Sequence, residues 1–136
     1  MNMSMRSFEK QTSKVLSVLG NAFRVRLILA LGDQEACVCH LEKLLKKRQA
    51  YISQHLMVLR EAGLLDTRRD GKYIYYRLSS DKAKDIIQSA AILAGIEPEN
   101  FPQYGAPEFL EKCECPSCDL DANANSKELN ILDSVS

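Results

Sequence analysis

Long apolar runs are missing from this chain of 136 residues. None approaches the roughly 20 consecutive apolar residues that a membrane-spanning helix needs. The first segment, MNMSMRSFEKQTSK, also lacks the apolar stretch of a secretory signal. We therefore expect a soluble, cytoplasmic protein that does not act at a membrane.

Glycine-rich loops and alternating strand–helix units are missing as well. A small thiol reductase would need a nucleophilic cysteine beside an anion-binding loop, or a C-x-x-C pair on a sheet scaffold. Only Cys115-Pro116-Ser117-Cys118 has that spacing, and no strand is expected before it. These absences argue against an enzyme, and we expect no organic cofactor.

Disulfide bonding is a poor explanation for the cysteines that are present. There are five of them, an odd number that cannot pair completely within one chain. In a reducing cytoplasm, a metal or redox role fits such thiols better than a disulfide framework. They form two groups, the pair Cys37 and Cys39 and the cluster Cys113, Cys115 and Cys118.

The periodicity of apolar residues predicts a mainly α-helical chain with one β-hairpin. Helices are expected over residues 7–19, 22–32, 35–48, 49–63 and 82–94. The sequence GLLDTRRDGKYIYYRLS indicates the hairpin, with Asp70-Gly71 as a type I′ turn. We expect a folded domain over residues 1–95 and an acidic, proline-containing, partly disordered tail over residues 96–136.

The net charge of zero conceals an uneven distribution along the chain. Residues 43–77 contain nine Lys or Arg against three acids, whereas residues 97–136 contain nine acids against two lysines. The middle of the chain is therefore the only strongly basic surface, and it is where a polyanion would bind. A solvated helix face is the simpler interpretation of the charge alone.

Two helices joined by a brief polar turn and followed by a basic hairpin predict a winged helix-turn-helix. In that arrangement the second helix enters the major groove of DNA by its N-terminal half, and the hairpin contacts phosphates. With Ile52, Leu56 and Leu59 on the buried edge, Ser53 and Gln54 face outward, and both side chains can bind base edges. The predicted DNA-contacting residues are Lys47, Arg48, Gln49, Ala50, Tyr51, Ser53, Gln54, His55, Arg60, Arg68, Arg69, Lys72 and Tyr73.

Two features of this surface have a structural interpretation beside the functional one. The helical wheel places His55 next to Leu59, so it is expected either to pack half-buried or to contact DNA. Alternation along the hairpin sends Ile74 and Tyr76 to the core face and Tyr73 and Tyr75 to the other. The aromatic residues alone are therefore weak evidence for DNA binding.

Taken together, the run EACVCHLEKLLKKRQAYISQHLMVLREAGLLDTRRDGKYIYYRLS resembles the core of the ArsR/SmtB family of bacterial metal-sensing repressors. It contains the E-x-C-V-C-x-L helix, the S-x-H-L-x-x-L-R-E-A-G-L-L recognition helix and the R-x-G-K-x-x-Y-Y-R-L wing. The segment LGNAFRVRLILAL is similar to the entry helix of the family. The resemblance covers residues 10–95 and implies a homodimer, closed by the first and last helices, that leaves its operator DNA when an inducer binds.

The pair Cys37 and Cys39 cannot grip one ion from within a regular helix, because positions two apart lie about 200° around the axis. They can do so if they straddle the helix start, where the backbone is not yet helical. Amides at a helix N-terminus favour the thiolate, and soft thiolates select thiophilic ions. The simpler interpretation is that Cys37 is a small core residue.

The resemblance implies a further ligand that the family's arsenic sensors take from the same helix. That position is Glu42 here, so the third thiol is expected from Cys113, Cys115 or Cys118, in one site shared with the pair or in two sites. Three sulfurs would suit arsenite, and four would suit cadmium or zinc. Family position favours a toxic metal or metalloid over a nutrient, so we expect As(III) first, then Cd(II) or Pb(II), and Zn(II) after them.

Two alternatives remain open. A thiol redox or persulfide sensor of the same fold is one, although the family's thiol switches use cysteines in two different helices. A structural zinc site formed by the tail is another. The family's second type of metal site, on the last helix, is not expected, because Asp81 and Asp85 are present there without a histidine.

Overall fold

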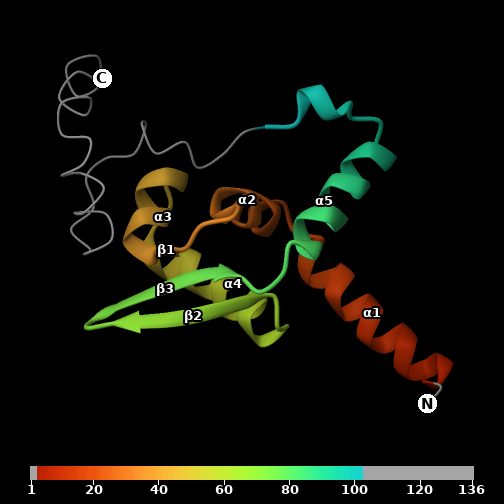
Figure 1. Cartoon of the computed structure of the whole chain (residues 1–136), viewed down its shortest axis with the longest axis horizontal. Helices are drawn as coiled ribbons and strands as arrows, with labels where there is room; N and C mark the ends of the chain where they lie inside the picture. The colour runs from red at the N-terminus through yellow and green to blue at the C-terminus, as the bar shows by residue number, and fades with distance from the viewer. Residues whose placement is uncertain (1–2, 103–136) are drawn as a thin grey trace.

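The computed structural model describes residues 3–102, and these form a mainly helical unit with a small antiparallel sheet (Figure 1). The sheet has the order β1-β3-β2, and α2, α3 and α4 pack against it. The elements are α1 (Met5–Leu19), α2 (Ala22–Leu31), β1 (Ala36–Cys37), α3 (Val38–Leu45), α4 (Gln49–Glu61), β2 (Leu65–Asp70), β3 (Tyr73–Leu78), α5 (Lys82–Leu93) and the one-turn 3-10 helix Pro98–Asn100. This confirms the predicted winged helix-turn-helix.

The first two helices begin at side-chain caps that the sequence supplies. Ser4 accepts the backbone N–H of Ser7 at 3.2 Å, and Asn21 accepts that of Arg24 at 3.1 Å. Such caps satisfy amides that have no partner within the helix. Gly20 separates the two helices, so the chain can turn sharply between them.

The core lies where α2, α3 and α4 meet. Its members are aliphatic side chains at helical spacing, and the fully buried ones are Leu27, Ile28, Leu41, Leu45, Ile52, Leu56 and Leu59. Burying each such side chain contributes about 1.5–3 kcal/mol. The buried edge of α4 is therefore the edge predicted from its periodicity, and it fixes which face of that helix looks outward.

The helix predicted over residues 35–48 is shorter than expected at both ends. Ala36 and Cys37 form an edge strand that pairs with Tyr76 and Tyr75 of β3, and α3 begins only at Val38. This strand depends on a hairpin far along the chain, so helical periodicity does not reveal it. At the other end Lys46 adopts the left-handed conformation, with φ 58° and ψ 42°, and ends the helix at Leu45.

The wing is the hairpin of β2 and β3, and its turn lies one residue later than predicted. Asp70 pairs with Tyr73, so the two turn residues are Gly71 and Lys72. Gly71 has a φ of 62° and Lys72 a negative φ, the pattern of a type II′ rather than a type I′ turn. The wing is still a hairpin with a two-residue turn, and Lys72 lies at its tip.

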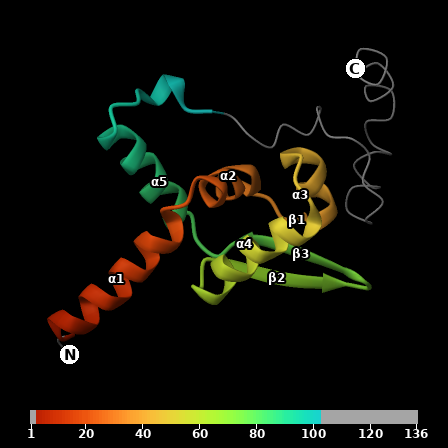
Figure 2. The same cartoon turned by 180° about the vertical axis from the view of Figure 1, so that it is seen from behind.

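Helices α1 and α5 lie at the end of the molecule opposite the wing tip, as both views show (Figures 1 and 2). Several of their apolar side chains are exposed, namely Met5, Phe8, Leu16, Ile92 and Leu93. Helix α5 ends at Leu93, close to the predicted domain boundary. Among residues 3–102, no helix combines the length and the apolar character needed to cross a membrane.

Candidate DNA interface and cysteine pair

The outward face of α4 carries the side chains predicted to read bases. Gln49, Ala50 and Gln54 are exposed and Ser53 is partly exposed, on the side of the helix away from its buried edge. Arg48, at the N-cap, and Lys47 precede them and are exposed as well. The first turn of α4 therefore presents amide, hydroxyl and cationic groups together, as major-groove recognition requires.

Tyr51 and His55 are tied to helix α2 through an aromatic cluster. The ring of Phe23 lies 4.7 Å from that of Tyr51 and 5.0 Å from that of His55, and the last two are 4.8 Å apart. Lys47 Nζ lies 5.7 Å from the Tyr51 centroid, within cation–π range. These contacts favour the packing interpretation of His55 and give Tyr51 a structural role beside any DNA contact.

Arg24 is a residue whose role sequence reasoning did not anticipate. Its Nε donates to His55 Nδ1 at 3.2 Å, and its Nη1 donates to the carbonyl of Val18 at 3.1 Å. One guanidinium therefore links the end of α1, the start of α2 and the middle of α4. Burial, and then the charge of Arg24, lower the pKa of His55 below its ordinary value. The only sequence signal for this role of Arg24 is its place in the segment LGNAFRVRLILAL, which is similar to the entry helix of the family.

The basic residues of the wing do not all point toward its tip. Arg69 and Lys72 are exposed, and Lys72 Nζ lies 5.4 Å from the ring centroid of Tyr73. Arg68 instead turns back to Glu35, donating from Nη2 at 2.5 Å and from Nε at 3.2 Å, and the hydrogen bond lowers the pKa of Glu35. Arg68, a predicted DNA contact, is therefore held by a carboxylate of its own chain.

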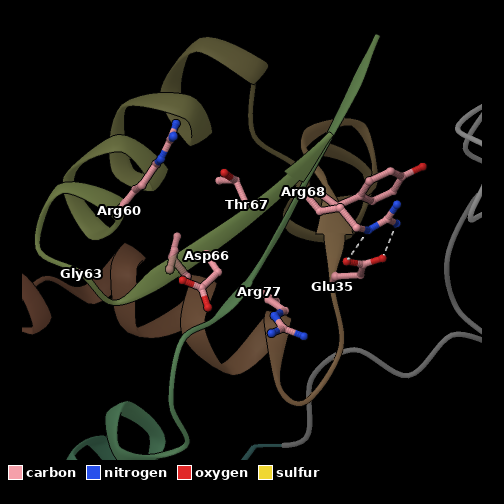
Figure 3. A pocket seen from close by; sticks show the side chains of 9 residues that line it. Glu35, Arg60, Gly63, Asp66, Thr67, Arg68 and Arg77 are labelled. Carbon is pink, nitrogen blue, oxygen red and sulfur yellow. Dashed lines mark hydrogen bonds and ion pairs between the residues drawn. The ribbon is translucent and has the colours of Figure 1, made fainter. Parts of the chain in front are cut away.

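A groove of about 770 Å³ runs between the C-terminal half of α4 and the wing (Figure 3). Arg60, a predicted DNA contact, lines it together with Thr67 and Arg77. In Figure 3 the side chains of Arg60 and Arg77 point in different directions, and Arg68 points to Glu35. The three arginines therefore do not converge on one bound group.

The cysteine pair straddles the start of α3, as predicted. Cys37 is the N-cap, with extended backbone at φ −82° and ψ 165°, and its Sγ accepts the backbone N–H of His40 at 3.4 Å. Cys39 lies in the first turn and is partly exposed, whereas Cys37 is only 2% exposed. Both pack in one small cluster with Tyr73 and Tyr75, apart from the main core.

Tyr75 was predicted to face away from the core, and it is in fact 1% exposed. It stands opposite Cys37 on β1 and opposite Arg68 on β2, whose guanidinium carbon lies 4.6 Å from its ring centroid. Tyr76, on the opposite face, packs on the main core as expected. The sheet face that carries Tyr75 is therefore part of a second, smaller core. It is covered because β1 pairs with β3 and brings Cys37 next to Tyr75.

The expected third ligand falls outside the described residues. Cys113, Cys115 and Cys118 lie beyond residue 102, so the shared-site prediction stays a prediction. Within residues 3–102, His, Cys, Asp and Glu side chains form no group of three that could hold a metal ion. The described part of the chain thus offers two sulfurs, which is fewer than arsenite or cadmium takes.

The chain is similar in sequence to known regulators of bacterial transcription. The sequence profile of the family described as "Bacterial regulatory protein, arsR family" matches residues 23–67. A biofilm growth-associated repressor of Agrobacterium fabrum is 40% identical over 98 residues, covering 70% of this chain and 84% of that protein. The arsenic resistance transcriptional regulator ArsR1 of Pseudomonas putida is 36% identical over 101 residues, covering 74% and 76%.

Among solved structures, the reduced form of HlyU from Vibrio cholerae superposes with a TM-score of 0.58 at 31% identity, covering 65% of this chain and 94% of that one. Fold and relatives alike are those of a DNA-binding regulator of transcription, and not those of an enzyme. The chain belongs to the arsR family of bacterial regulatory proteins, as a transcriptional repressor of the ArsR/SmtB type.

Proposed function

We propose that this protein is a cytoplasmic, homodimeric repressor that leaves its operator when a thiophilic metal or metalloid binds its cysteines. Arsenite is the first candidate inducer, followed by cadmium and lead. The observation that carries the proposal is the position of Cys37. Its sulfur caps α3, the helix that directly precedes α4, the proposed DNA-recognition helix. An ion bound there pulls on α3, and α3 packs directly against α4.

On the DNA side, we assign base contacts to the exposed first half of α4, namely Gln49, Ala50, Ser53 and Gln54, with Tyr51 beside them. Phosphate contacts are assigned to Lys47, Arg48, Arg60, Arg69, Lys72 and the hydroxyl of Tyr73. His55 and Arg68 have partners within the protein and are given structural roles. Binding through several phosphates should weaken steeply with salt.

On the inducer side, the sulfurs of Cys37 and Cys39 suit a soft ion but supply only part of the ligands that such an ion needs. The amide N–H that reaches Cys37 Sγ stabilises a thiolate, which is the form that binds metal. Cys39 follows two residues later in the same cluster. The remaining sulfur is assigned to the tail cluster Cys113, Cys115 and Cys118, from the same subunit or from its partner.

The proposed dimer uses the exposed apolar residues of α1 and α5. A monomer seldom leaves so many large apolar side chains uncovered on two neighbouring helices. Pairing of two subunits there would place the two copies of α4 and the wing apart, one for each half of an operator. The two copies of α4 would then contact successive major grooves.

The experiment is a titration of the reduced, full-length protein, bound to a labelled fragment of its own promoter, with arsenite, Cd(II), Pb(II) and Zn(II). Two variants accompany it, Cys37→Ser/Cys39→Ser and Cys113→Ser/Cys115→Ser/Cys118→Ser. Release by one ion that either variant abolishes supports one shared site. Release that survives the tail variant, with a loss of thermal stability, makes the tail a structural site.

A thiol redox or persulfide sensor is the second candidate. The observation in its favour is that HlyU of Vibrio cholerae, a structural relative, is described explicitly in its reduced form. Cys37 and Cys39 share one cluster, so a single oxidised or persulfidated sulfur would also disturb the start of α3. Adding peroxide and a persulfide donor to the same titration compares the two candidates. Release by an ion leaves the thiols reactive toward a thiol reagent once the ion is removed, whereas release by oxidation or persulfidation consumes them.

A further inference from the structure

One face of the sheet carries a row of side chains that joins the cysteine pair to the wing. Cys37 of β1 stands opposite Tyr75 of β3, and Tyr75 stands opposite Arg68 of β2. Directly opposed residues in neighbouring strands lie on the same face, so these three are adjacent across the whole sheet. The row begins at a thiol and ends on the outer strand of the wing.

Arg68 closes this row into a ring by turning back over Tyr75. Its guanidinium carbon lies 4.6 Å from the centroid of the Tyr75 ring, and its Nη2 and Nε bind the two carboxylate oxygens of Glu35 at 2.5 and 3.2 Å. Glu35 precedes Cys37 by two residues. Figure 3 shows this bidentate pair between the wing and the segment that enters β1. The outer strand is therefore fastened to the cysteine segment across β3.

We propose that Glu35, Tyr75 and Arg68 are positioning residues that couple the cysteine pair to the wing. The inference rests on the proposed function, because it names how occupation of the thiols reaches the DNA-binding surface. A fork-to-fork arginine–carboxylate pair is directional, so a shift of the Cys37 backbone carries Glu35 with it and breaks the pair. Arg68 and its strand then lose their anchor, and the wing no longer holds its place on the phosphates.

The exposure of the pair agrees with coupling rather than with stabilisation. The side chains of Arg68 and Glu35 are 51% and 30% exposed, and exposed ion pairs contribute little to stability. A weak but well-aligned contact can break without unfolding the protein. Tyr75 beneath it is fully buried, so the wing and β1 have a rigid support between them.

The test measures operator affinity by fluorescence anisotropy, with and without saturating arsenite, or Cd(II) or Pb(II) where arsenite does not release the wild type. The variants are Glu35→Gln, Arg68→Gln and the two together. Arg69→Gln is the matched control, since it removes the same charge from the next residue of β2 and the opposite face of the wing. Thiolate-to-metal absorbance in the ultraviolet checks that every variant still binds the ion.

The coupling ratio is the Kd for DNA with ion divided by the Kd without ion. We expect the ratio to fall about tenfold in Glu35→Gln and in Arg68→Gln, within the range of allosteric couplings, with no further fall in the double variant. In Arg69→Gln the ratio should stay at the wild-type value while the slope of log Kd against log salt falls by about 1. Wild-type ratios in Glu35→Gln and Arg68→Gln, or an Arg68→Gln that behaves like Arg69→Gln, would overturn the proposal.

A second readout needs no ion. Hydrogen–deuterium exchange of the metal-free variants should rise both in residues 35–39 and in the wing in Glu35→Gln and Arg68→Gln, but not in Arg69→Gln. Unchanged exchange in both segments would show that the Glu35–Arg68 pair does not join residues 35–39 to the wing. If no ion releases the wild type, the inducer assignment fails, and the exchange result alone still decides whether the pair joins the two segments.

Discussion

At the scale of single residues, the recognition helix is held in place by groups that do not face DNA. His55 accepts a hydrogen bond from Arg24, which also binds the carbonyl of Val18. Phe23 contacts the rings of both Tyr51 and His55. These inward contacts fix the rotation of α4 about its own axis, and with it the set of side chains that faces outward.

The burial of His55, with the charge of Arg24 beside it, predicts a dependence of stability on pH. The folded state holds the pKa of His55 below its ordinary value of 6.5, so on acidification the unfolded chain takes up the proton first. The free energy of unfolding should therefore fall as the pH drops below about 6.5 and level off below the folded-state pKa. Thermal denaturation at pH 7.5 and 5.5 measures this fall.

His55→Gln is the control for that measurement, because it keeps an acceptor for Arg24 but does not titrate. It should lose less stability than the wild type between the two pH values. Equal losses in the two proteins would mean that His55 titrates alike in both states. His40 is present in both proteins, so its contribution cancels in the comparison.

Gln54 offers a test of base reading at the same scale. Gln54→Ala should reduce the preference for the promoter over a scrambled sequence by about 1–3 kcal/mol, since a bidentate base contact is lost. Lys72→Ala, at the wing tip, should instead weaken binding to both sequences alike. Binding measured on the two DNAs at fixed salt decides the matter. A uniform loss in Gln54→Ala would remove it from the list of base readers.

Helical period alone predicts the inner and outer faces of α4, because Ile52, Leu56 and Leu59 make a local pattern. The pairing of Cys37 with Tyr75 and the reach of Arg68 to Glu35 join residues more than thirty positions apart. No local pattern encodes such contacts, so the sequence places Tyr75 on the face away from the core and Arg68 among the DNA-contacting residues. The position of Cys37 at the helix start was predictable because its chemistry required it.

At the scale of elements, the two ends of α3 have opposite characters. Its first end is capped by a sulfur that the proposed inducer also uses. Its last end is closed by Lys46 in a left-handed conformation, the only positive φ outside glycine in residues 3–102. For a residue with a Cβ that conformation is costly, and glycine is the usual solution.

Replacing Lys46 by glycine should therefore stabilise the protein. We expect Lys46→Gly to raise the free energy of unfolding by about 1 kcal/mol, since glycine adopts this conformation without steric cost. Lys47→Gly removes the same charge at a residue with ordinary φ, so it should destabilise the protein slightly. Urea denaturation of both variants gives the two values. A loss of stability in Lys46→Gly would show that the Lys46 side chain has contacts worth more than the strain.

The wing shows what sequence can and cannot determine for an element. Its strands were predicted from the β-forming run around Tyr73 to Tyr76, and the position of the hairpin is confirmed. Its turn was placed at Asp70-Gly71, although the register puts it at Gly71-Lys72. A glycine can serve the first or the second turn position, and only the pairing of the two strands decides between them.

At the scale of the whole molecule, α1 and α5 carry apolar side chains that the monomer leaves exposed, among them Leu16 and Ile92. The double variant Leu16→Glu/Ile92→Glu should shift the protein from dimer to monomer at micromolar concentration, because each carboxylate would be buried in the interface. Operator affinity should fall with it, since one subunit contacts only half a site. Sedimentation velocity and anisotropy measure the two effects on the same samples.

Lys14→Glu is the control for this pair, because Lys14 lies about 200° around α1 from Leu16. It should leave the dimer intact. A double variant that remains dimeric would place the interface elsewhere on the molecule. The exposed side chains would then need a different partner, and the predicted closure by the first and last helices would be wrong.

Tyr75 gives the molecule an optical reporter of its own. The chain has five tyrosines and no tryptophan, so tyrosine emission is not masked by a brighter fluorophore. Tyr75 is buried in the same cluster as both cysteines, where a heavy ion held by their sulfurs would quench it through spin–orbit coupling. Ion binding should thus be visible without labels or DNA, and the double variant Tyr73→Phe/Tyr75→Phe should remove most of the signal, because both rings lie in this cluster.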